Sequence, residues 1–362
     1  MRVAWIEVRD FRNHADLRLE IPAGLTVVVG ANAMGKTNLL EAVHYLCALE
    51  SPRVSTDLPL VRRGAVSAFL RGEVESAEGR TLIEVEIRSG GQNRVQMNRS
   101  PVRRRRDVRR HVRSVFSGPD DLRVVQGDPE DRRRFMDQVV AGLWPIKEAL
   151  SGAYERVLRQ RNRLLRDWGG VGEPPGLAAW DTELAAHGSA LTASRRQAVG
   201  RIQDRATREF RLISGRDLEA LGVAYRPSVD EEAAEDAFIR RLADRRADEL
   251  VRRTTLVGPH RDELTLEIRG MATRGFASHG EGWAAVVALR LALSGAVREE
   301  IGEPPVTLLD DPFSALDPDR RRRLAQGLLD RGQVMIAVPD ESQTPEGAIV
   351  WHVGAGGAVG PR

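Results

Sequence analysis

Two short stretches of this chain carry side chains that could bind a phosphate group and help to cleave it. The first runs from Gly30 to Thr37 and fits the pattern G-x-x-x-x-G-K-[ST], called the P-loop below. Its glycines let the backbone turn its N–H groups around a phosphate, and the following helix adds a positive dipole end. We expect the Lys36 ammonium to contact the β- and γ-phosphates of ATP and the Thr37 hydroxyl to bind Mg²⁺. The residues expected to contact the nucleotide here are Gly30, Ala31, Asn32, Ala33, Met34, Gly35, Lys36, Thr37 and Asn38.

The second stretch is the pair Asp310-Asp311, which follows an apolar run at residues 306–309. The first carboxylate would hold Mg²⁺, and the second would orient or deprotonate the attacking water. Adjacent aspartates are also common at the start of a loop, so the pair is informative because a P-loop precedes it. Together the two stretches predict a site that hydrolyses ATP, in which Lys36 and Asp311 are the catalytic residues.

The P-loop pattern has few fixed positions and also arises by chance. Here its surroundings agree with the pattern, because residues 25–29 form a β-branched apolar run typical of a buried strand and residues 39–46 have helical apolar spacing. The chain has 55 basic residues, of which only Lys36 and Lys147 are lysines. A chain that uses arginine almost everywhere keeps a lysine where a compact ammonium is needed.

A third stretch, Ser278-His279-Gly280-Glu281, precedes an apolar helical pattern at residues 284–293. It is called the signature segment below. A hydroxyl, a glycine and a helix N-terminus make a second arrangement that can bind an anion. The alternative is an ordinary helix cap in which Ser278 and Glu281 form a capping box. Taken alone, the cap is the better interpretation, but the position one helix before Asp310-Asp311 favours an anion site.

Composition limits the class of protein. With 362 residues, the chain can form two domains or one large domain with an insertion. The one cysteine, Cys47, excludes intrachain disulfides and a cysteine-based zinc site. The beginning of the sequence has no apolar signal core, and no apolar run approaches the roughly 20 residues that span a bilayer. We therefore expect a cytoplasmic protein without a membrane partner.

The order of predicted elements gives the fold class. Strands are expected at 3–8, 16–20 and 94–97, with a hairpin at 67–76 and 80–88. Long helical patterns begin near 146 and 180, separated by the Gly- and Pro-rich turn 169–176, and predict an antiparallel helical hairpin, with the single histidine of its second helix, His187, in the core. Another charged helix is expected at 231–252. Strands return at 306–311, 334–338 and 348–353, and no role is evident for the Gly-rich tail. The prediction is an α/β head with a mixed sheet, residues 1–135 and 254–362, interrupted by a helical arm, residues 136–253.

Residues 99–113 contain eight arginines without matching acids. Such a run can contact a phosphate backbone, although no aromatic residues interleave to stack on bases. The alternative is pairing with acids elsewhere, such as Glu130-Asp131 or Glu231-Glu232. The candidate contacts to duplex DNA are Arg103, Arg104, Arg105, Arg106, Arg109 and Arg110.

The P-loop, the signature segment, Asp310-Asp311 and Ser314-Ala315-Leu316-Asp317 occur in the order of an ABC-type ATPase head. With a helical insertion between its halves, the chain resembles the SMC-like class and, within it, the RecF family. The segments that carry this resemblance are residues 10–13, 30–42, 119–122, 127–135, 160–162, 258–262 and those around Ser278 and Asp310.

The resemblance implies further properties. Heads of this family dimerise with ATP between them, so Ser278, Gly280 and Glu281 of one subunit would contact the nucleotide bound to the other. Arg12 and Asn13 would approach the nucleotide. The family binds duplex DNA near gaps or junctions and works with RecR-like and RecA-like proteins in recombination and repair.

The chain also departs from the family pattern. Trp283 stands where a polar or basic residue is usual, Ala33-Met34 restrict the P-loop backbone, and Pro339 follows the strand 334–338 without a histidine or threonine to sense the γ-phosphate. Gln126 is the one candidate for a glutamine that follows the nucleotide. We therefore expect slow hydrolysis. The alternatives are an SMC-like ATPase that serves another repair or defence protein, and a nucleotide switch with weak catalysis.

Overall fold

The computed structural model describes residues 1–215, 220–229, 235–354 and 359–361. The chain forms two compact units. The head unit contains Met1–Leu122, Arg205–Ala220 and Ala277–Arg362, and the arm unit contains Arg123–Asp204 and Leu221–Phe276. The predicted arm, residues 136–253, overlaps the arm unit without coinciding with it: pairing between distant strands holds residues 221–226 and 263–268 together in the arm unit, and residues 205–220 belong to the head unit.

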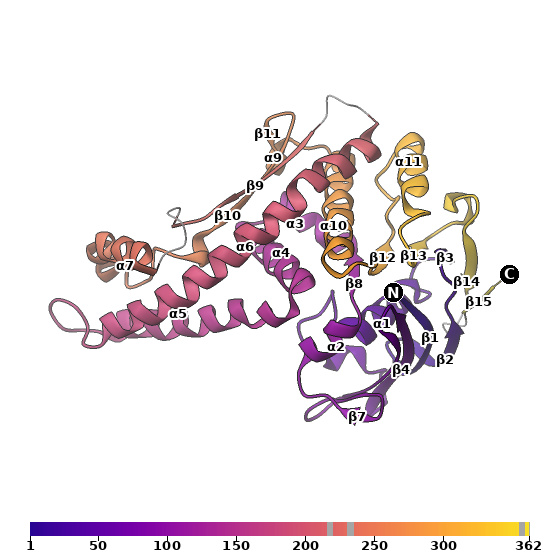
Figure 1. Cartoon of the computed structure of the whole chain (residues 1–362), viewed down its shortest axis with the longest axis horizontal. Helices are drawn as coiled ribbons and strands as arrows, with labels where there is room; N and C mark the ends of the chain where they lie inside the picture. Colours follow the sequence, from indigo (N-terminus) through magenta and orange to yellow (C-terminus); the bar gives the residue numbers. More distant parts are fainter. Residues whose placement is uncertain (216–219, 230–234, 355–358, 362) are drawn as a thin grey trace. The chain divides into compact units, whose positions relative to one another are not determined.

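One sheet of the head unit has six described strands in the order β15-β14-β3-β13-β12-β8 (Figure 1). All neighbours are parallel except β14 and β15. Its central strands are apolar and buried on both faces, as parallel strands require. The tail residues 359–361 form the strand β15, which pairs with β14. The sequence did not predict β15. The bounds are β3 Leu25–Val29, β8 Ser114–Ser117, β12 Val306–Asp310, β13 Val334–Val338, β14 Ile349–Val353 and β15 Val359–Pro361.

The second sheet of the head unit is antiparallel, in the order β2-β1-β4-β5-β6-β7. It contains all the N-terminal strands predicted from alternating residues, including the hairpin. The head thus has two sheets where the sequence suggested one mixed sheet, because β1 pairs with β2 and β4 and not with β3. The bounds are β1 Arg2–Phe11, β2 His14–Glu20, β4 Ser67–Ser76, β5 Gly79–Arg88, β6 Arg94–Met97 and β7 Ser100–Pro101.

Helix α1 (Lys36–Ala48) belongs to the hydrophobic core that joins the two sheets. Leu39, Leu40 and Val43 of this helix are fully buried. The other α-helices that lie wholly within the head, among the described residues, are α2 (Arg105–His111), α10 (His279–Ile301) and α11 (Pro318–Leu328). By length and composition α10 could cross a membrane, contrary to the expectation from the apolar runs of the sequence, but 89% of its apolar window is buried inside the protein.

The arm unit is mainly helical, with a three-stranded sheet in the order β11-β10-β9. Helices α5 (Ala149–Asp167) and α6 (Leu177–Ser214) form the predicted hairpin, and the boundary between the units falls within α6. The described part of 231–252 forms two helices where one was predicted, and 231–234 lie outside the described residues. The remaining bounds are α3 Leu122–Gln126, α4 Pro129–Leu143, β9 Leu221–Arg226, α7 Glu235–Asp244, α8 Arg246–Arg252, β10 Glu263–Ile268, β11 Met271–Ala272 and α9 Thr273–Phe276.

A buried charge holds the arm together. Arg161, which interrupts the apolar stripe of α5, is fully buried. Its guanidinium donates to Asp181 at 2.8 Å, to Glu249 at 2.6 Å and to the Thr255 hydroxyl at 2.7 Å. An ion-pair network therefore surrounds Arg161 within the apolar stripe of α5, because the donors of a buried arginine need acceptors. The expectation that His187 lies in the core was wrong: its side chain is 38% exposed and lies 3.8 Å from Glu183.

Candidate nucleotide-binding site

The P-loop has the local geometry that its glycines predict. A Cβ atom on Gly30 would lie 2.9 Å from the Val353 carbonyl oxygen, and one on Gly35 would lie 2.4 Å from the Asn13 amide. Gly35 also has φ 108°, a left-handed conformation that favours glycine. Helix α1 begins at Lys36 without a side-chain cap, so its first N–H groups face the loop rather than a capping oxygen. A phosphate group could accept from them.

Lys36 lies over the loop. Its ammonium donates to the carbonyl oxygens of Gly30 at 2.7 Å and Ala31 at 3.0 Å. Burial lowers the pKa of Lys36, while the nearby carboxylates of Asp310 and Asp311 act in the opposite direction. The ammonium is therefore desolvated beside the position that a phosphate would occupy, where its charge interacts strongly.

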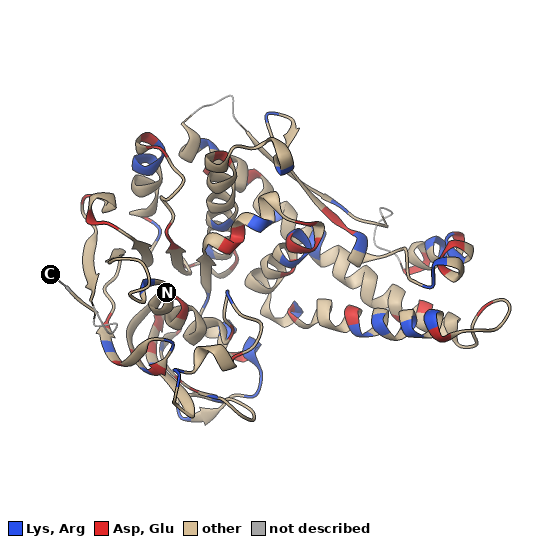
Figure 2. Cartoon of the chain, turned by 180° about the vertical axis from the view of Figure 1, so that it is seen from behind, with Lys and Arg blue, Asp and Glu red and all other residues tan. Residues whose placement is uncertain are grey.

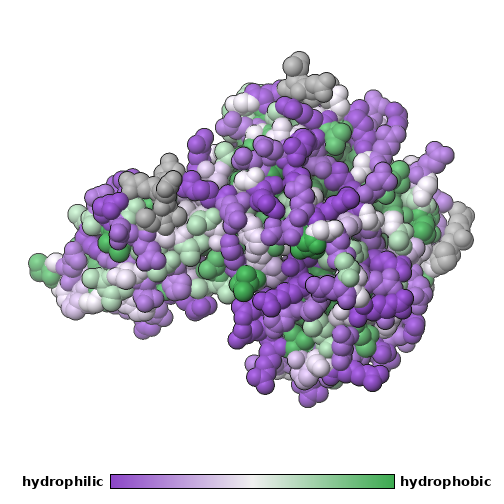
Figure 3. Space-filling model, viewed as in Figure 1, coloured by the Kyte–Doolittle hydropathy of each residue, from purple (hydrophilic) through white to green (hydrophobic). Residues whose placement is uncertain are grey.

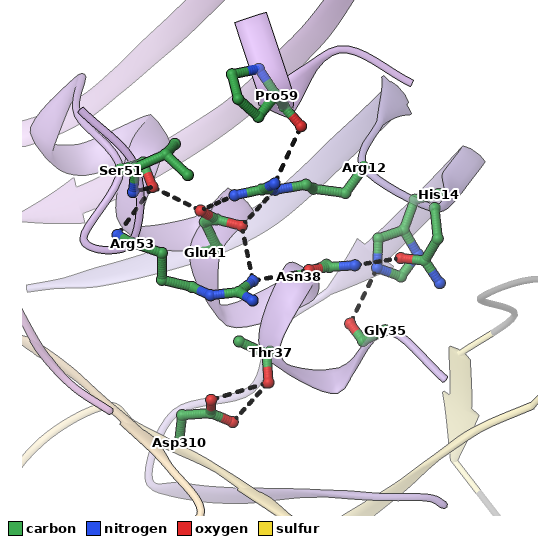
Figure 4. Close-up of polar contacts among 12 residues, drawn as sticks. Arg12, His14, Gly35, Thr37, Asn38, Glu41, Ser51, Arg53, Pro59 and Asp310 are labelled. Atoms are coloured by element: carbon green, nitrogen blue, oxygen red, sulfur yellow. Dashed lines mark hydrogen bonds and ion pairs between the residues drawn. The ribbon is translucent and has the colours of Figure 1, made fainter. Parts of the chain in front are cut away.

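Thr37 and Asp310 meet across 273 residues of sequence. The Thr37 hydroxyl lies 2.9 Å and 2.8 Å from the two oxygens of the Asp310 carboxylate (Figure 4). The parallel sheet causes this contact, since β3, β13 and β12 are neighbours and their carboxyl ends share one edge. Burial raises the pKa of Asp310, and the hydrogen bond from Thr37 opposes that effect.

Asp311 follows at the start of the next loop. Its φ is 52°, in the left-handed region, and its N–H donates to the Ala337 carbonyl at 2.9 Å. Its Oδ1 atom is buried and has no hydrogen-bond partner in the described part of the chain. Burial raises the pKa of Asp311, whereas Lys36 and Arg321 lower it. An acceptor left unsatisfied in this position suits a group that receives a hydrogen bond from a bound water.

These residues fit Mg²⁺ and ATP together. Among the residues that the structure describes, no group of three or more His, Cys, Asp or Glu side chains could hold a metal ion. Thr37 and Asp310 therefore supply too few ligands by themselves, and phosphate oxygens would complete the set, as Mg²⁺ usually requires in nucleotide sites. When bound, Mg²⁺ would neutralise charge on the phosphates.

Arg12 and Asn13 both contact the P-loop helix or loop, as Figure 4 shows for Arg12. Arg12 forms a two-pronged ion pair with the fully buried Glu41, with both distances 2.8 Å. Asn13 donates to the Met34 carbonyl at 3.0 Å and accepts from Asn38 at 2.7 Å. Both side chains thus support the loop and α1. Contact with the nucleotide itself remains a prediction.

Two residues near the loop were missed from the sequence. Glu41 is completely buried on the apolar helix α1, and Arg53 contacts both Asn38, at 3.1 Å, and Glu41, at 3.4 Å. The charge of Glu41 within an apolar helical run was a usable signal. Arg53 gave none, because only tertiary packing brings its loop to α1.

The signature segment begins α10. Ser278 caps the helix by accepting from the Glu281 N–H at 3.3 Å, and its own N–H donates to the Glu281 carboxylate at 2.8 Å. The capping box is therefore present. A Cβ atom on Gly280 would lie 3.0 Å from the Ala315 carbonyl oxygen, so the glycine allows the segment Ser314 to Asp317 to approach. The anion-binding role of the segment remains a prediction.

Trp283 is 3% exposed, and its indole N–H donates to the Pro312 carbonyl at 2.9 Å. This side chain packs inside the head and supports the loop that carries Asp311, so it does not offer a surface to a second subunit. Gln126, at the end of α3, is exposed.

The arginine run has two kinds of member. Arg103, Arg104 and Arg110 are exposed. Arg109 is buried: its guanidinium contacts Glu50 at 2.6 Å and the Ala48 carbonyl at 3.0 Å. Arg105 also contacts Glu50, at 3.3 Å. The acid that pairs with the run is thus Glu50 and not Glu130 or Asp131, which pair with Arg134 within the arm; Glu231-Glu232 lie outside the described residues.

Comparisons with known proteins show the family of the chain. The family model described as RecF/RecN/SMC N terminal domain matches residues 2–349. The DNA replication and repair protein RecF of Cutibacterium acnes is 40% identical over 372 residues, which cover 96% of this chain and 94% of that protein. The protein of the same name from Kineococcus radiotolerans is 39% identical over 367 residues, covering 94% of each chain.

Solved structures give the same result. The recombination mediator protein RecF of the RecFOR pathway, solved as RecF-ATP, superposes with a TM-score of 0.87 at 27% identity, covering 99% of this chain and 97% of that one. An Smc head domain from Pyrococcus furiosus has a TM-score of 0.57 at 14% identity, covering 99% and 96%, and shares the fold. The fold is that of an ABC-type ATPase head of the SMC-like class. Within that class, the chain belongs to the RecF family.

Proposed function

We propose that this protein is an ATP-binding recombination mediator that acts in DNA replication and repair. Mg²⁺-ATP binds at the P-loop of one subunit and contacts Ser278, Gly280 and Glu281 of a second copy, so that ATP drives dimerisation. Hydrolysis, with Lys36 and Asp311 as the catalytic residues, releases the dimer.

The contact between Thr37 and Asp310 carries this proposal. A hydroxyl at the start of the P-loop helix and a carboxylate at the end of a neighbouring strand lie within 2.9 Å, which is the ligand pair that Mg²⁺ needs beside a phosphate-binding loop. The ammonium of Lys36, held over the same loop, supports the same conclusion.

The names of the relatives support the biological role. They are DNA replication and repair proteins, and the structural neighbour is a mediator of the RecFOR pathway with ATP. We propose that the protein works in the cytoplasm, binds duplex DNA near single-strand gaps, and supports recombinase loading with RecR-like and RecA-like partners. Arg103, Arg104 and Arg110 are the most accessible candidates for DNA contact.

Slow hydrolysis is part of the proposal. Pro339 ends the strand beside the P-loop strand and provides no polar hydrogen for a γ-phosphate. ATP would then act mainly as a switch, because the ATP-bound dimer would persist for a long time before hydrolysis. A nucleotide switch without measurable hydrolysis is the second candidate function, and the same residue favours it.

Light scattering with and without Mg²⁺-ATP, together with phosphate release with and without duplex DNA, tests the proposal. We expect a monomer without ATP, a dimer with ATP and slow phosphate release that DNA stimulates. Dimerisation without phosphate release would favour the second candidate. A rate of phosphate release that duplex DNA does not change would favour an SMC-like ATPase that serves another protein.

Ser278→Arg tests the shared pocket directly. The bulky cation should prevent ATP-dependent dimerisation but leave ATP binding to the monomer intact. Ser278→Ala is the matched control, because it removes the same cap, at a cost of about 1 kcal/mol, without adding bulk. Normal dimerisation of Ser278→Arg would contradict a pocket shared between two copies.

A further inference from the structure

A buried ion pair anchors the signature helix inside the head unit. Arg290 of α10 is 7% exposed. Its Nε atom donates to Asp121 Oδ2 at 2.9 Å, and a terminal nitrogen donates to Asp121 Oδ1 at 2.5 Å. Two parallel charge-assisted hydrogen bonds fix both distance and orientation, which a single contact cannot do.

The acidic partner also holds the loop that follows β8. Asp121 ends the short 3-10 helix Pro119–Asp121, and its carboxylate accepts from the Gly118 N–H at 3.2 Å. A Cβ atom on Gly118 would lie 3.8 Å from the Cβ of Asp310. The loop fixed by Asp121 therefore lies directly against the proposed Mg²⁺ ligand.

Helix α1 borders the same place. Burial, together with the charges of Arg109 and Arg290, lowers the pKa of its His44 to about 3, although Asp121 acts in the opposite direction. The neutral ring shares a hydrogen bond of 3.0 Å with the Ser114 hydroxyl and packs 5.6 Å from Phe116 of β8. Three elements thus approach this ion pair: α1, which carries Lys36, β12, which ends at Asp310, and α10, which begins with the signature segment.

We propose that Arg290 and Asp121 are positioning residues, which hold the N-terminus of α10 in register with the P-loop and so couple ATP binding to dimerisation. The proposal rests on the function proposed above. Ser278 lies 12 residues before Arg290, about 18 Å along a helix that is buried almost throughout, so an anchor at Arg290 determines where Ser278 and Gly280 are presented. Asp121 also immediately precedes Leu122, the last residue of the first head segment. A displacement of Asp121 would therefore also displace the chain segment that leads from the head unit into the arm unit.

Arg290→Met tests the coupling, with Arg290→Lys as the conservative variant. The hydrogen bonds described for the pair join Arg290 to Asp121 and Asp121 to Gly118, outside the P-loop, so the ATP affinity of the monomer should stay within about twofold of the unmodified protein. ATP-dependent dimerisation should weaken by about tenfold or more, which is within the usual range of coupling between sites. The kcat for phosphate release should fall with little change in KM, and Arg290→Lys should recover part of both losses.

Arg331→Met is the matched control. Arg331 pairs with Glu209 through two bonds of 2.8 Å and 2.7 Å in the same unit, its side chain is 20% exposed, and its described hydrogen bonds run to Glu209 and to the Gly327 carbonyl. It should lose comparable thermal stability and dimerise normally with ATP. The proposal is overturned if Arg290→Met dimerises like the unmodified protein, or if Arg331→Met weakens dimerisation equally.

Amide hydrogen exchange at residues 279–283 separates this proposal from the shared pocket. In the unmodified protein ATP should slow exchange there, and in Arg290→Met it should not. A protein that stays monomeric with ATP, yet shows this dependence on Arg290, would refute the shared pocket and retain the positioning pair. An equal response in both proteins would refute the pair.

Discussion

Replacing Lys36 with methionine removes the charge at the P-loop and keeps most of the side-chain length. In the structure the ammonium makes two short hydrogen bonds, to the carbonyls of Gly30 and Ala31, and we expect it to direct two such bonds to phosphate oxygens when ATP binds. A hydrogen bond to a charged group contributes about 1.5–3 kcal/mol. At the lower end of that range two bonds contribute about 3 kcal/mol, so ATP affinity should fall about 150-fold.

We expect Lys36→Met to cause no loss of folding stability. Burial lowers the pKa of Lys36, which means that the charged form is disfavoured in the folded protein, and methionine removes that penalty. The melting temperature without nucleotide should therefore be unchanged or higher, while the ATP-induced rise in melting temperature is lost.

Titration of ATP by calorimetry, followed by light scattering, measures the effect. Lys147→Met is a matched control, because Lys147 is the other lysine of the chain and packs over the Trp144 ring, 4.3 Å away, in the arm unit. An ATP affinity of Lys36→Met within about threefold of the control would refute the assigned role of the ammonium.

Three further predictions follow from the structure. Arg161→Met should lower the unfolding free energy by about 3 kcal/mol, because it leaves the buried carboxylate of Glu249 without its arginine and leaves Asp181 to pair with Arg246 alone. Arg163→Met, on the exposed face of α5, should cost no more than about 0.5 kcal/mol in the same denaturation assay. The pKa of Asp311 is raised in the folded protein, so the folded state binds this proton more tightly than the unfolded chain does. The free energy of unfolding therefore falls as the pH rises above the pKa that Asp311 has in the unfolded chain. Asp311→Asn should therefore raise the melting temperature without nucleotide at neutral pH, and the gain should shrink in acid, whereas a gain independent of pH would contradict the argument. Alanine at Arg103, Arg104 and Arg110 should reduce the salt slope of duplex DNA binding by roughly 0.9 for each arginine that had neutralised a DNA phosphate, while alanine at Arg156, Arg159 and Arg163 should leave that slope unchanged.

The control set in the arm is suitable because its charges are mixed. Figure 2 shows basic and acidic residues alternating along the helices of the arm. Arg159 pairs with Glu155, and Arg163 pairs with Asp167. On the face drawn in Figure 3, hydrophobic residues are scattered among hydrophilic ones, as is usual on protein surfaces. An unchanged slope after substitution of Arg103, Arg104 and Arg110 would mean that this run faces something other than DNA.

Local patterns were sufficient where the structure depends on neighbours in sequence. The strand at residues 25–29 and the helix that follows the P-loop both occur where they were predicted. In both cases the deciding features, β-branched residues in succession and a glycine before a helix, lie within a few residues.

Interactions between distant residues could not be predicted in this way. A row of arginines looks the same whether its members face solvent, as Arg103 does, or bind Glu50, as Arg109 does. The interruption of the α5 stripe at Arg161 gave no indication that acids from α6 and α8 would surround it. Such pairs depend on how helices pack, and packing is not encoded by spacing along one helix.

The sequence by itself determined the chemical groups of the candidate site and their order: a glycine-containing loop, a lysine and a threonine hydroxyl at the helix that follows it, and two adjacent carboxylates after a later strand. Only the tertiary structure decided that Thr37 and Asp310 touch, and that Arg290 binds Asp121. The physical reason is that parallel strands bring their carboxyl ends to one edge whatever their separation along the chain, whereas sequence patterns report only the interactions that act over a few residues.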